Sequence, residues 1–317
     1  MTRITPPILF RGEPYAVEDG IPRYCEFNQY VDNYQRIAAD HVAAMRPGVT
    51  NPFIEDELWT NLERSTQTIV ARHLPAGSAI LDVGVGLGRL LDPLRQFTRY
   101  GVDISQAYLV RAREVGIQVA FARAEDLPFD DSVFDAVCAC DVLEHVPDLN
   151  AVCREMLRVL KPGGVLIVRV PSREDLSVYL REDLPYEFIH LRNFELAGLR
   201  LLFGKVFGMT FLEGSEVCPY LQGSARLRLR LVPEETRIKM ASIVQRLPRG
   251  PSSLRLDRVF EISDEAFCSW MYWLRDQHPE TFKEVAPHLL LGMGVNAAFR
   301  KPPLTTTNTG RSDKLVG

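Results

Sequence analysis

The stretch ILDVGVGLGRLL, residues 80–91, decides the fold of this chain. An apolar run leads into Asp82, and a glycine then occupies every second position. Because glycine has no Cβ, it lets the backbone turn sharply and come close to a ligand. A helix that begins after such a bend offers free N–H groups and the positive end of its dipole. The stretch therefore predicts a buried strand followed by a ligand-binding bend. The glycines are Gly84, Gly86 and Gly88.

Short apolar runs alternate with helical patterns along residues 78–172. Several runs are apolar at consecutive positions, as strands buried on both faces of a sheet tend to be. Such alternation predicts an α/β fold with a doubly wound, mostly parallel sheet of the Rossmann-like type. The five strand candidates are 79–85, 99–104, 119–124, 135–140 and 165–170, and the helical patterns between them are 88–97, 106–115 and 150–160.

The flanking regions differ in character from this core. Helical periodicity covers 28–45 and 54–73, and Asp19-Gly20 is typical of a turn. A helix is predicted at 193–203, with strands at 209–217 and 294–302. The resulting division is an N-terminal segment with lid helices at 1–75, a cofactor-binding core at 76–215, an inserted cap at 216–292, a last core strand at 293–302 and a disordered tail at 303–317.

Asp103 ends the second strand candidate, about 20 residues after Asp82. A carboxylate at this place can accept hydrogen bonds from both hydroxyls of a nucleoside ribose. The alternative is that Asp103 caps the next helix. The glycine bend upstream favours the ribose.

Four further motifs follow in a fixed order. They are AEDLPF at 124–129, FDAV at 134–137, LEHVPD at 143–148 and LRVLKPGGVLIV at 157–168. Together they resemble the class I S-adenosylmethionine-dependent methyltransferases of the ubiquinone-biosynthesis and small-molecule type. The resemblance covers about 28–212 and 293–302, and it implies a seven-stranded sheet whose last strand is antiparallel.

The resemblance implies S-adenosyl-L-methionine as the cofactor. Asp82 would lie near its methionine end, and Asp103 would hold its ribose. Arg123 departs from the pattern, because relatives often carry Asp or Asn there to accept a bond from the adenine amino group, and arginine only donates. Glu125 or a backbone carbonyl would then replace it. The implied cofactor residues are Tyr34, Asp82, Gly84, Gly86, Gly88, Asp103, Ile104, Ala124, Glu125, Asp126, Cys140 and Asp141.

Two histidines are candidates for the acceptor end of the site. A neutral imidazole is the usual base when an oxygen is methylated. His190 lies in the region where this class places acceptor-binding residues, so we expect it to act as base or acceptor ligand, with a packing or capping role as the alternative. His145, in LEHVPD, would shape the site. Tyr34 in the lid would contact the methionine portion, unless Tyr34 and Tyr30 only pack their helix.

The inserted cap offers two further features. Arg226, Arg228 and Arg230 alternate with leucine, which predicts a strand with one basic face. That face is either a solvated edge or a surface for an anionic acceptor. The aromatic segment 263–282, with Trp270, Tyr272 and Trp273, would line the acceptor pocket or form core or dimer contacts. The sequence therefore leaves undecided whether the chain forms a homodimer.

Composition and charge argue against several other classes of protein. The 317 residues carry a net charge of −4, and the apolar regions are too short and too charged to span a membrane, so neither nucleic acid nor a membrane span is expected. No cysteine pair has C-x-x-C spacing, which predicts reduced thiols, no metal and a cytoplasmic location. The reaction expected is methyl transfer to a small-molecule acceptor. The methyl group would go to an oxygen of a natural product, sugar or lipid intermediate. The alternatives are a non-catalytic scaffold, an NAD-dependent reductase and an RNA methyltransferase.

Overall fold

The computed structural model describes residues 10–47, 50, 56–172, 176–180, 189–217, 273, 276–280 and 294–303. Within them, one sheet holds all nine strands. The strands are β1 (Ala16–Glu18), β2 (Ile21–Arg23), β3 (Ala79–Val83), β4 (Thr98–Asp103), β5 (Gln118–Phe121), β6 (Phe134–Cys140), β7 (Leu160–Val170), β8 (Thr210–Val217) and β9 (Gly294–Arg300). The helices are α1 (Gln29–Ala44), α2 (Asp56–His73), α3 (Gln106–Glu114), α4 (Leu149–Val159) and α5 (Leu196–Leu199), with a 3-10 turn η1 (Leu176–Leu180) and a π-helix η2 (Arg200–Val206).

The strand order is β1-β2-β5-β4-β3-β6-β7-β9-β8. The strands from β2 to β7 run parallel, and β9 is antiparallel to both β7 and β8. The chain starts the parallel core at β3, adds β4 and β5 on one side, and then continues with β6 and β7 on the other. That reversal creates a crevice at the carboxyl ends of the central strands, where ligands bind in sheets of this kind. The predicted α/β class is confirmed.

The sheet has two strands more than the seven expected. Within 10–27, the predicted turn at Asp19-Gly20 joins β1 and β2 into a hairpin, and both turn residues have positive φ, 50° and 71°. Such a two-residue turn suits the twist of paired strands. β2 then pairs with β5 through Arg23 and Phe121, so the hairpin covers that edge of the parallel core.

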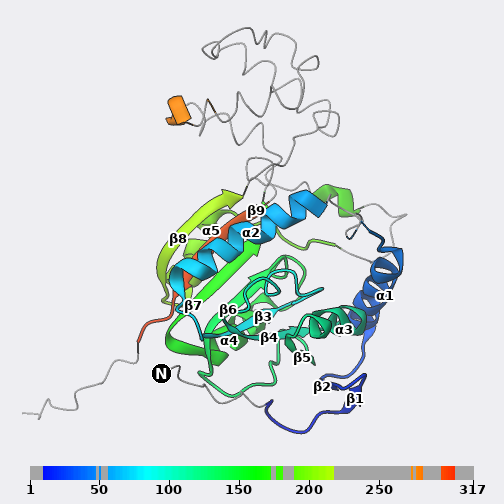
Figure 1. Ribbon diagram of the computed structural model, residues 1–317. Coiled ribbons are helices and arrows are strands. Elements are labelled where there is room, and N and C mark those ends of the chain that lie inside the picture. Colours follow the sequence, from blue (N-terminus) through cyan, green and yellow to red (C-terminus); the bar gives the residue numbers. More distant parts are fainter. Residues whose placement is uncertain are drawn as a thin grey trace, which may run out of the picture.

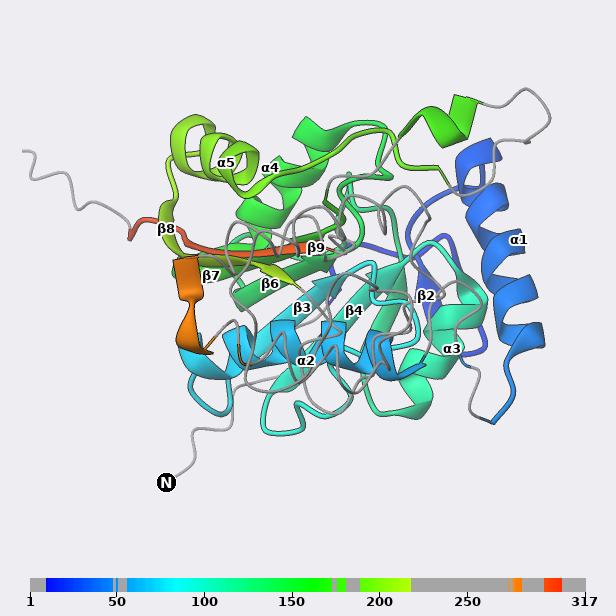
Figure 2. The same ribbon diagram turned by 90° about the horizontal axis from the view of Figure 1, so that it is seen from above.

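Helices cover both faces of the sheet, as Figures 1 and 2 show. Seen from above in Figure 2, α2 and α3 lie on one side, whereas α4 and α5 lie on the other. Each layer buries its own apolar cluster, one with Ile69 and Leu109, the other with Met156 and Phe203. A sheet buried on both faces needs apolar residues at consecutive positions, which explains the unbroken runs in the sequence.

The helix boundaries follow from local capping. Asn28 accepts a hydrogen bond from the Val31 amide at 2.9 Å and begins α1. Asp148 does the same for the Ala151 amide at 3.0 Å and begins α4. Ser105 holds the N-cap position of α3, so Asp103 is left available for another role.

The helix predicted over 88–97 is wrong. The segment forms successive turns, closed by bonds such as Leu94 N–H to Leu91 C=O at 3.1 Å and Phe97 N–H to Leu94 C=O at 3.1 Å. Pro93 explains the difference, because it has no N–H to donate to the fourth residue before it. The side-chain amide of Gln67 on α2 instead donates to the carbonyls of Arg89 and Leu90.

Much of the predicted cap lies outside the described residues, including Arg226, Arg228, Arg230, Trp270 and Tyr272. The predicted domain boundaries therefore stay predictions. Trp273 is described and lies against His278, with ring centroids 4.9 Å apart. No helix in the described part of the chain is long and apolar enough to cross a membrane.

Candidate functional site

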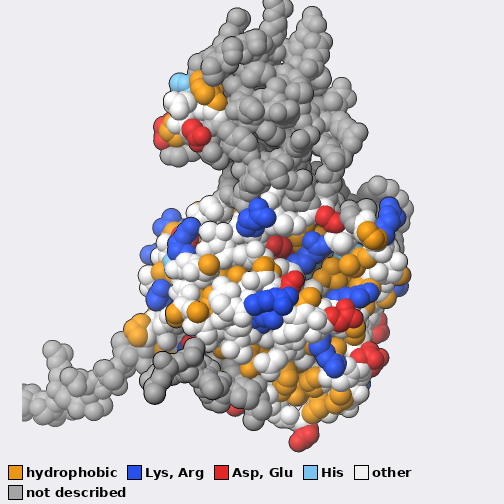
Figure 3. All heavy atoms as spheres, viewed as in Figure 1, with side chains coloured by type: hydrophobic (Ala, Val, Ile, Leu, Met, Phe, Trp, Pro, Cys, Tyr) orange, Lys and Arg blue, Asp and Glu red, His pale blue; other side chains and the backbone are white. Residues whose placement is uncertain are grey.

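A cavity of about 660 Å³ opens at the carboxyl ends of β3, β4 and β6. Its volume is in the range of small-molecule sites. Figure 3 shows hydrophobic side chains gathered on this face of the molecule, between α2 and α1. Most of the predicted site residues line the cavity, namely Tyr34, Asp82, Gly84, Gly86, Asp103, Ile104, Ala124, Glu125, Cys140, Asp141, His145 and His190.

Gly88 and Asp126 do not line the cavity. A Cβ at Gly88 would come within 2.7 Å of the Ile117 Cδ1 atom and 3.1 Å of the Ala112 Cα atom. Gly88 therefore lets α3 pack closely, and its predicted contact with the cofactor stays a prediction. The Asp126 amide donates to the Arg123 carbonyl at 3.2 Å, within the turn that follows β5.

The other two glycines differ in what surrounds them. Gly84 has φ +76°, and a Cβ there would clash with the Val142 Cγ2 atom. Gly86 has φ +49° and open space where a Cβ would stand. Since Gly86 lines the cavity, any side chain at this position would project into space available to a ligand.

Asp103 and the glycine bend are joined by a hydrogen bond. The Gly86 amide donates to Oδ2 of Asp103 at 2.9 Å, which links the end of β4 to the bend after β3. Burial raises the pKa of Asp103 to about 6, against hydrogen bonds from Gly86 and Ser105 that favour the carboxylate. The side chain is thus held in place at the cavity wall before any ligand arrives.

Asp82 is buried at the end of β3, with only 2% of its surface exposed. Its Oδ1 atom has no hydrogen-bond partner among the described residues. Burial, and then the nearby carboxylate of Glu63, raise the pKa of Asp82 well above its usual value. A buried carboxylate in this setting is suited to a ligand that brings a positive charge or a donor.

Arg169, near the end of β7, is a site residue that the sequence reasoning missed. It is fully buried and donates to Glu63 at 3.1 and 3.2 Å, to Asp141 at 2.7 Å and to Thr66 at 3.3 Å. Burial opposes its charged form, but Asp141 and Glu63 outweigh burial and raise the pKa of Arg169. The signal was present in the sequence, because VLIVRV places a charge inside an otherwise apolar central strand.

The lid helix α1 brings aromatic side chains to the cavity. Tyr30 and Tyr34 both line it, with ring centroids 4.9 Å apart, and Tyr34 lies edge-on to His145 at 5.9 Å. Ser105 donates its hydroxyl to the Tyr34 carbonyl at 3.3 Å, which ties the lid to the end of β4. The contact of Tyr34 with a methionine portion stays a prediction.

Further lining residues from the lid also escaped the sequence reasoning. His41 on α1 lies 2.7 Å from the hydroxyl of Tyr108 on α3, and its other ring nitrogen lies 2.8 Å from the Thr50 carbonyl. On α2, Trp59 donates to Glu63 at 2.7 Å and is covered by the Arg89 guanidinium. The contacts of His41 with Tyr108 and of Trp59 with Arg89 join elements distant in sequence, so no local pattern indicates them.

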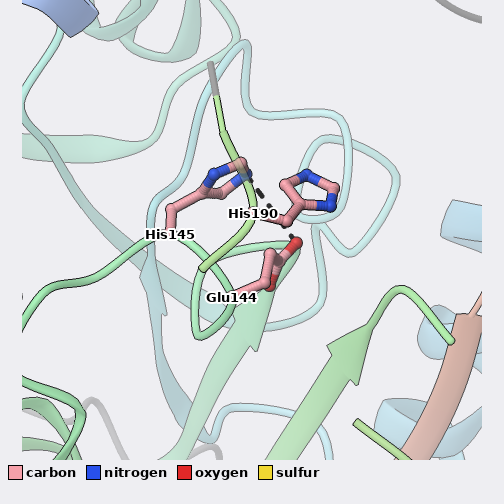
Figure 4. Close-up of side chains that lie close together, drawn as sticks. All are labelled: Glu144, His145 and His190. Atoms are coloured by element: carbon pink, nitrogen blue, oxygen red, sulfur yellow. Dashed lines mark ion pairs between the residues drawn. The ribbon is translucent and has the colours of Figure 1, made fainter. Parts of the chain in front are cut away.

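Two histidines and a glutamate meet at one side of the cavity, as Figure 4 shows. Glu144 and His145 follow β6, and His190 comes from the segment before α5. The His145 and His190 rings have centroids 4.5 Å apart. Burial, and then His190, lower the pKa of His145 to about 3, which keeps its imidazole neutral.

The segment after His190 is fixed to the same turn. Arg192 donates to the carbonyls of Leu143 and Val146 at 2.8 and 2.6 Å. Arg192 therefore ties the segment that carries His190 to the turn that follows β6.

Arg123 and Cys140 have local roles. Arg123 pairs with Glu125 at 3.1 Å, so the carboxylate suggested as an adenine partner is already bound to that arginine. Burial raises the pKa of the Cys140 thiol well above its usual value, which keeps the thiol protonated. Cys138 and Cys140 contribute to the same apolar cluster, as their spacing on β6 predicts.

Residues 81–168 match a family model described as a methyltransferase domain. The chain is 34% identical to the ubiquinone biosynthesis O-methyltransferase of Xanthomonas axonopodis pv. citri, over 40% of this chain and 60% of that protein. It is 39% identical to the 2-methyl-6-phytyl-1,4-hydroquinone methyltransferase of Synechocystis sp., over 32% of this chain and 35% of that protein. These alignments span less than two thirds of either relative.

A solved structure resembles the chain over most of its length. It belongs to the complex between the Haloferax volcanii Trm112 methyltransferase activator and the putative methyltransferase. The match has a TM-score of 0.52 and 19% identity, and covers 86% of this chain and 98% of that one. At this identity the likeness concerns the fold, and it agrees with the Rossmann-like sheet described above.

Proposed function

Since this chain carries a class I S-adenosylmethionine-dependent methyltransferase domain, we propose that it methylates an oxygen atom of a small-molecule acceptor in the described cavity. The observation that carries the proposal is the joint position of Asp82, Gly86 and Asp103. They stand at the ends of two neighbouring parallel strands and line one cavity. The methyltransferase domain accounts for the cofactor S-adenosyl-L-methionine. The oxygen atom of a small-molecule acceptor is what we propose.

The adenosine end of S-adenosyl-L-methionine fits the Asp103 side of the cavity. The carboxylate can accept hydrogen bonds from both ribose hydroxyls. The open space at Gly86 leaves room for the ligand to approach the backbone. Ile104 and Ala124 add apolar surface for the adenine ring.

The methionine end fits the Asp82 side. Its ammonium group would donate to the Oδ1 atom of Asp82, which has no partner in the described part of the protein. That contact would offset the burial that raises the pKa of Asp82. Arg169 holds Asp141 and Glu63 nearby and keeps this carboxylate-rich wall ordered.

The bound cofactor supplies an activated methyl group on a sulfonium. The protein then has to align the acceptor, exclude water and remove the hydroxyl proton. His190 and His145 stand at the cavity wall where an acceptor would lie, and we assign His190 the contact with its oxygen. The named activities of the quinone-pathway relatives support a small-molecule acceptor.

Calorimetric titration and a transfer assay test this function. We expect S-adenosyl-L-methionine to bind with one site per chain, and label from its methyl group to appear in a small molecule of a metabolite extract. Binding without transfer to any metabolite would favour a non-catalytic scaffold. Tight NAD binding in the absence of S-adenosyl-L-methionine binding would contradict the assignment altogether.

A further inference from the structure

Glu144, His145 and His190 each present a ligand atom to the others at one wall of the cavity. These atoms all lie within 4.8 Å of one another. The Glu144 Oε1 atom lies 3.8 Å from the His145 Nε2 atom, the contact drawn in Figure 4. Two ligand atoms on one cation, each about 2.0–2.2 Å from it, are at most about 4.4 Å apart, so the 3.8 Å between Glu144 and His145 is compatible with a shared metal ion.

The tautomer of His145 directs a lone pair toward the cluster. Its Nδ1 atom lies 3.0 Å from the Ile189 carbonyl, which can only accept, so Nδ1 carries the hydrogen. The Nε2 atom then faces the Glu144 carboxylate as an acceptor. Metal-binding histidines usually donate their second ring N–H to a carbonyl or carboxylate in this way.

Hydrogen bonds to main-chain carbonyls hold the two contributing segments together. The Leu191 amide donates to the Glu144 carbonyl at 2.8 Å, and Arg192 donates to the carbonyls of Leu143 and Val146. His190 is therefore fixed beside the turn that carries the other two side chains. A site whose ligands are positioned in advance loses little conformational freedom when an ion binds.

We propose that Glu144, His145 and His190 bind one divalent transition-metal cation, of the zinc class, whose remaining position faces the cavity. Two imidazoles and a carboxylate are the ligands of such cations, whereas magnesium and calcium take oxygen ligands. Cysteine spacing gave no reason to expect a metal ion. It could not indicate this site, because none of the three proposed ligands is a cysteine. The site differs from the cofactor wall at Asp82 and Asp103.

The inference rests on the proposed function and narrows its acceptor to a hydroxyl or phenol oxygen that can bind the cation. Coordination lowers the pKa of such a hydroxyl, and its proton leaves to solvent. The oxygen then forms a bond to the methyl carbon while the carbon–sulfur bond breaks. The electron pair of the broken bond stays on sulfur. The sulfonium becomes a neutral thioether, so charge and atoms balance. His190 then acts as a ligand rather than as a free base.

Cobalt(II) titration of the full chain, made without a histidine tag and treated with a chelator, tests the site. We expect one Co²⁺ per chain, seen in its visible absorption, and competition by Zn²⁺. Glu144→Gln and His190→Asn should each weaken Co²⁺ binding by at least about 100-fold. His73→Gln is the matched control, because His73 pairs with Glu213 at the end of α2 and does not line the cavity, and it should bind Co²⁺ like the unchanged protein.

Cofactor binding by the same variants separates a lost ligand from a lost fold. Retained S-adenosyl-L-methionine binding with lost Co²⁺ binding supports the site. Equal Co²⁺ affinity in all four proteins, or no Co²⁺ binding by the unchanged chain, overturns it. Co²⁺ binding without cofactor binding would leave the metal site standing and contradict the proposed function instead.

Discussion

Arg169 and Asp141 hold each other through both backbone and side chain. The Asp141 amide donates to the Arg169 carbonyl at 2.8 Å, and the Arg169 guanidinium donates to the Asp141 carboxylate at 2.7 Å. Asp141 has φ +56°, a conformation that costs free energy in a residue with a side chain. The double contact keeps the end of β6 bent toward the cavity and joins it, through Arg169 and Glu63, to α2.

Arg169→Met should destabilise the protein by about 3–5 kcal/mol, because it leaves the buried Glu63 carboxylate without its charged partner. Urea denaturation measures the change. Arg95→Met is the control, since Arg95 pairs with Asp92 in an exposed position and should change stability by less than about 0.5 kcal/mol. Adding Glu63→Gln to Arg169→Met should recover part of the loss, and no recovery would contradict the pairing.

Asp103→Ala should weaken S-adenosyl-L-methionine binding by about 1.5–3 kcal/mol, the scale of a hydrogen bond to a charged partner. Isothermal titration calorimetry measures it. Asp92→Ala, which removes an exposed carboxylate outside the cavity, should leave the dissociation constant unchanged. An unchanged constant in Asp103→Ala would refute the ribose assignment.

Cofactor affinity should also depend on pH through Asp103. The carboxylate form accepts the ribose hydroxyls, and the pKa of this group is about 6, raised by burial. Affinity should therefore be full above about pH 6 and fall as the pH drops through that value. Calorimetry from pH 7.5 to about pH 5 follows the change, and Asp103→Asn should show a flatter profile. An equal slope in both proteins would assign the titration to another group.

Gly86→Val should abolish cofactor binding, because its side chain would enter the cavity. Gly77→Val is a matched control. Gly77 also has positive φ and open space around it but does not line the cavity, so it shares the backbone strain alone. Loss of binding in both variants, measured by calorimetry, would attribute the effect to strain instead of to the cavity.

His190→Ala should lower the turnover rate by about 100-fold or more while cofactor binding persists. The expectation holds whether the imidazole takes the acceptor proton or binds a cation that acidifies the hydroxyl. Steady-state transfer assays measure the rate once an acceptor is found, with His73→Gln as reference. A mild effect would demote His190 to a packing role.

The sequence by itself determined the order of the parallel strands β3 to β7 and most of one cavity wall. Unbroken apolar runs require burial on both faces, and glycines at alternate positions allow a bend, so β3, Gly86, Asp82 and Asp103 could be predicted together. Capping residues such as Asn28 fixed helix starts locally. These features depend on neighbours within a few residues.

Only the tertiary structure decided the contacts that join distant segments. Arg169 meets Glu63 across more than a hundred residues, and His190 meets Glu144 across α4, β7 and η1. Where a helix was predicted, the chain forms turns at Pro93. The side-chain amide of Gln67 on α2 donates to two carbonyls of these turns. Such pairings arise from how the helices pack on the twisted sheet, and local periodicity carries no information about that packing.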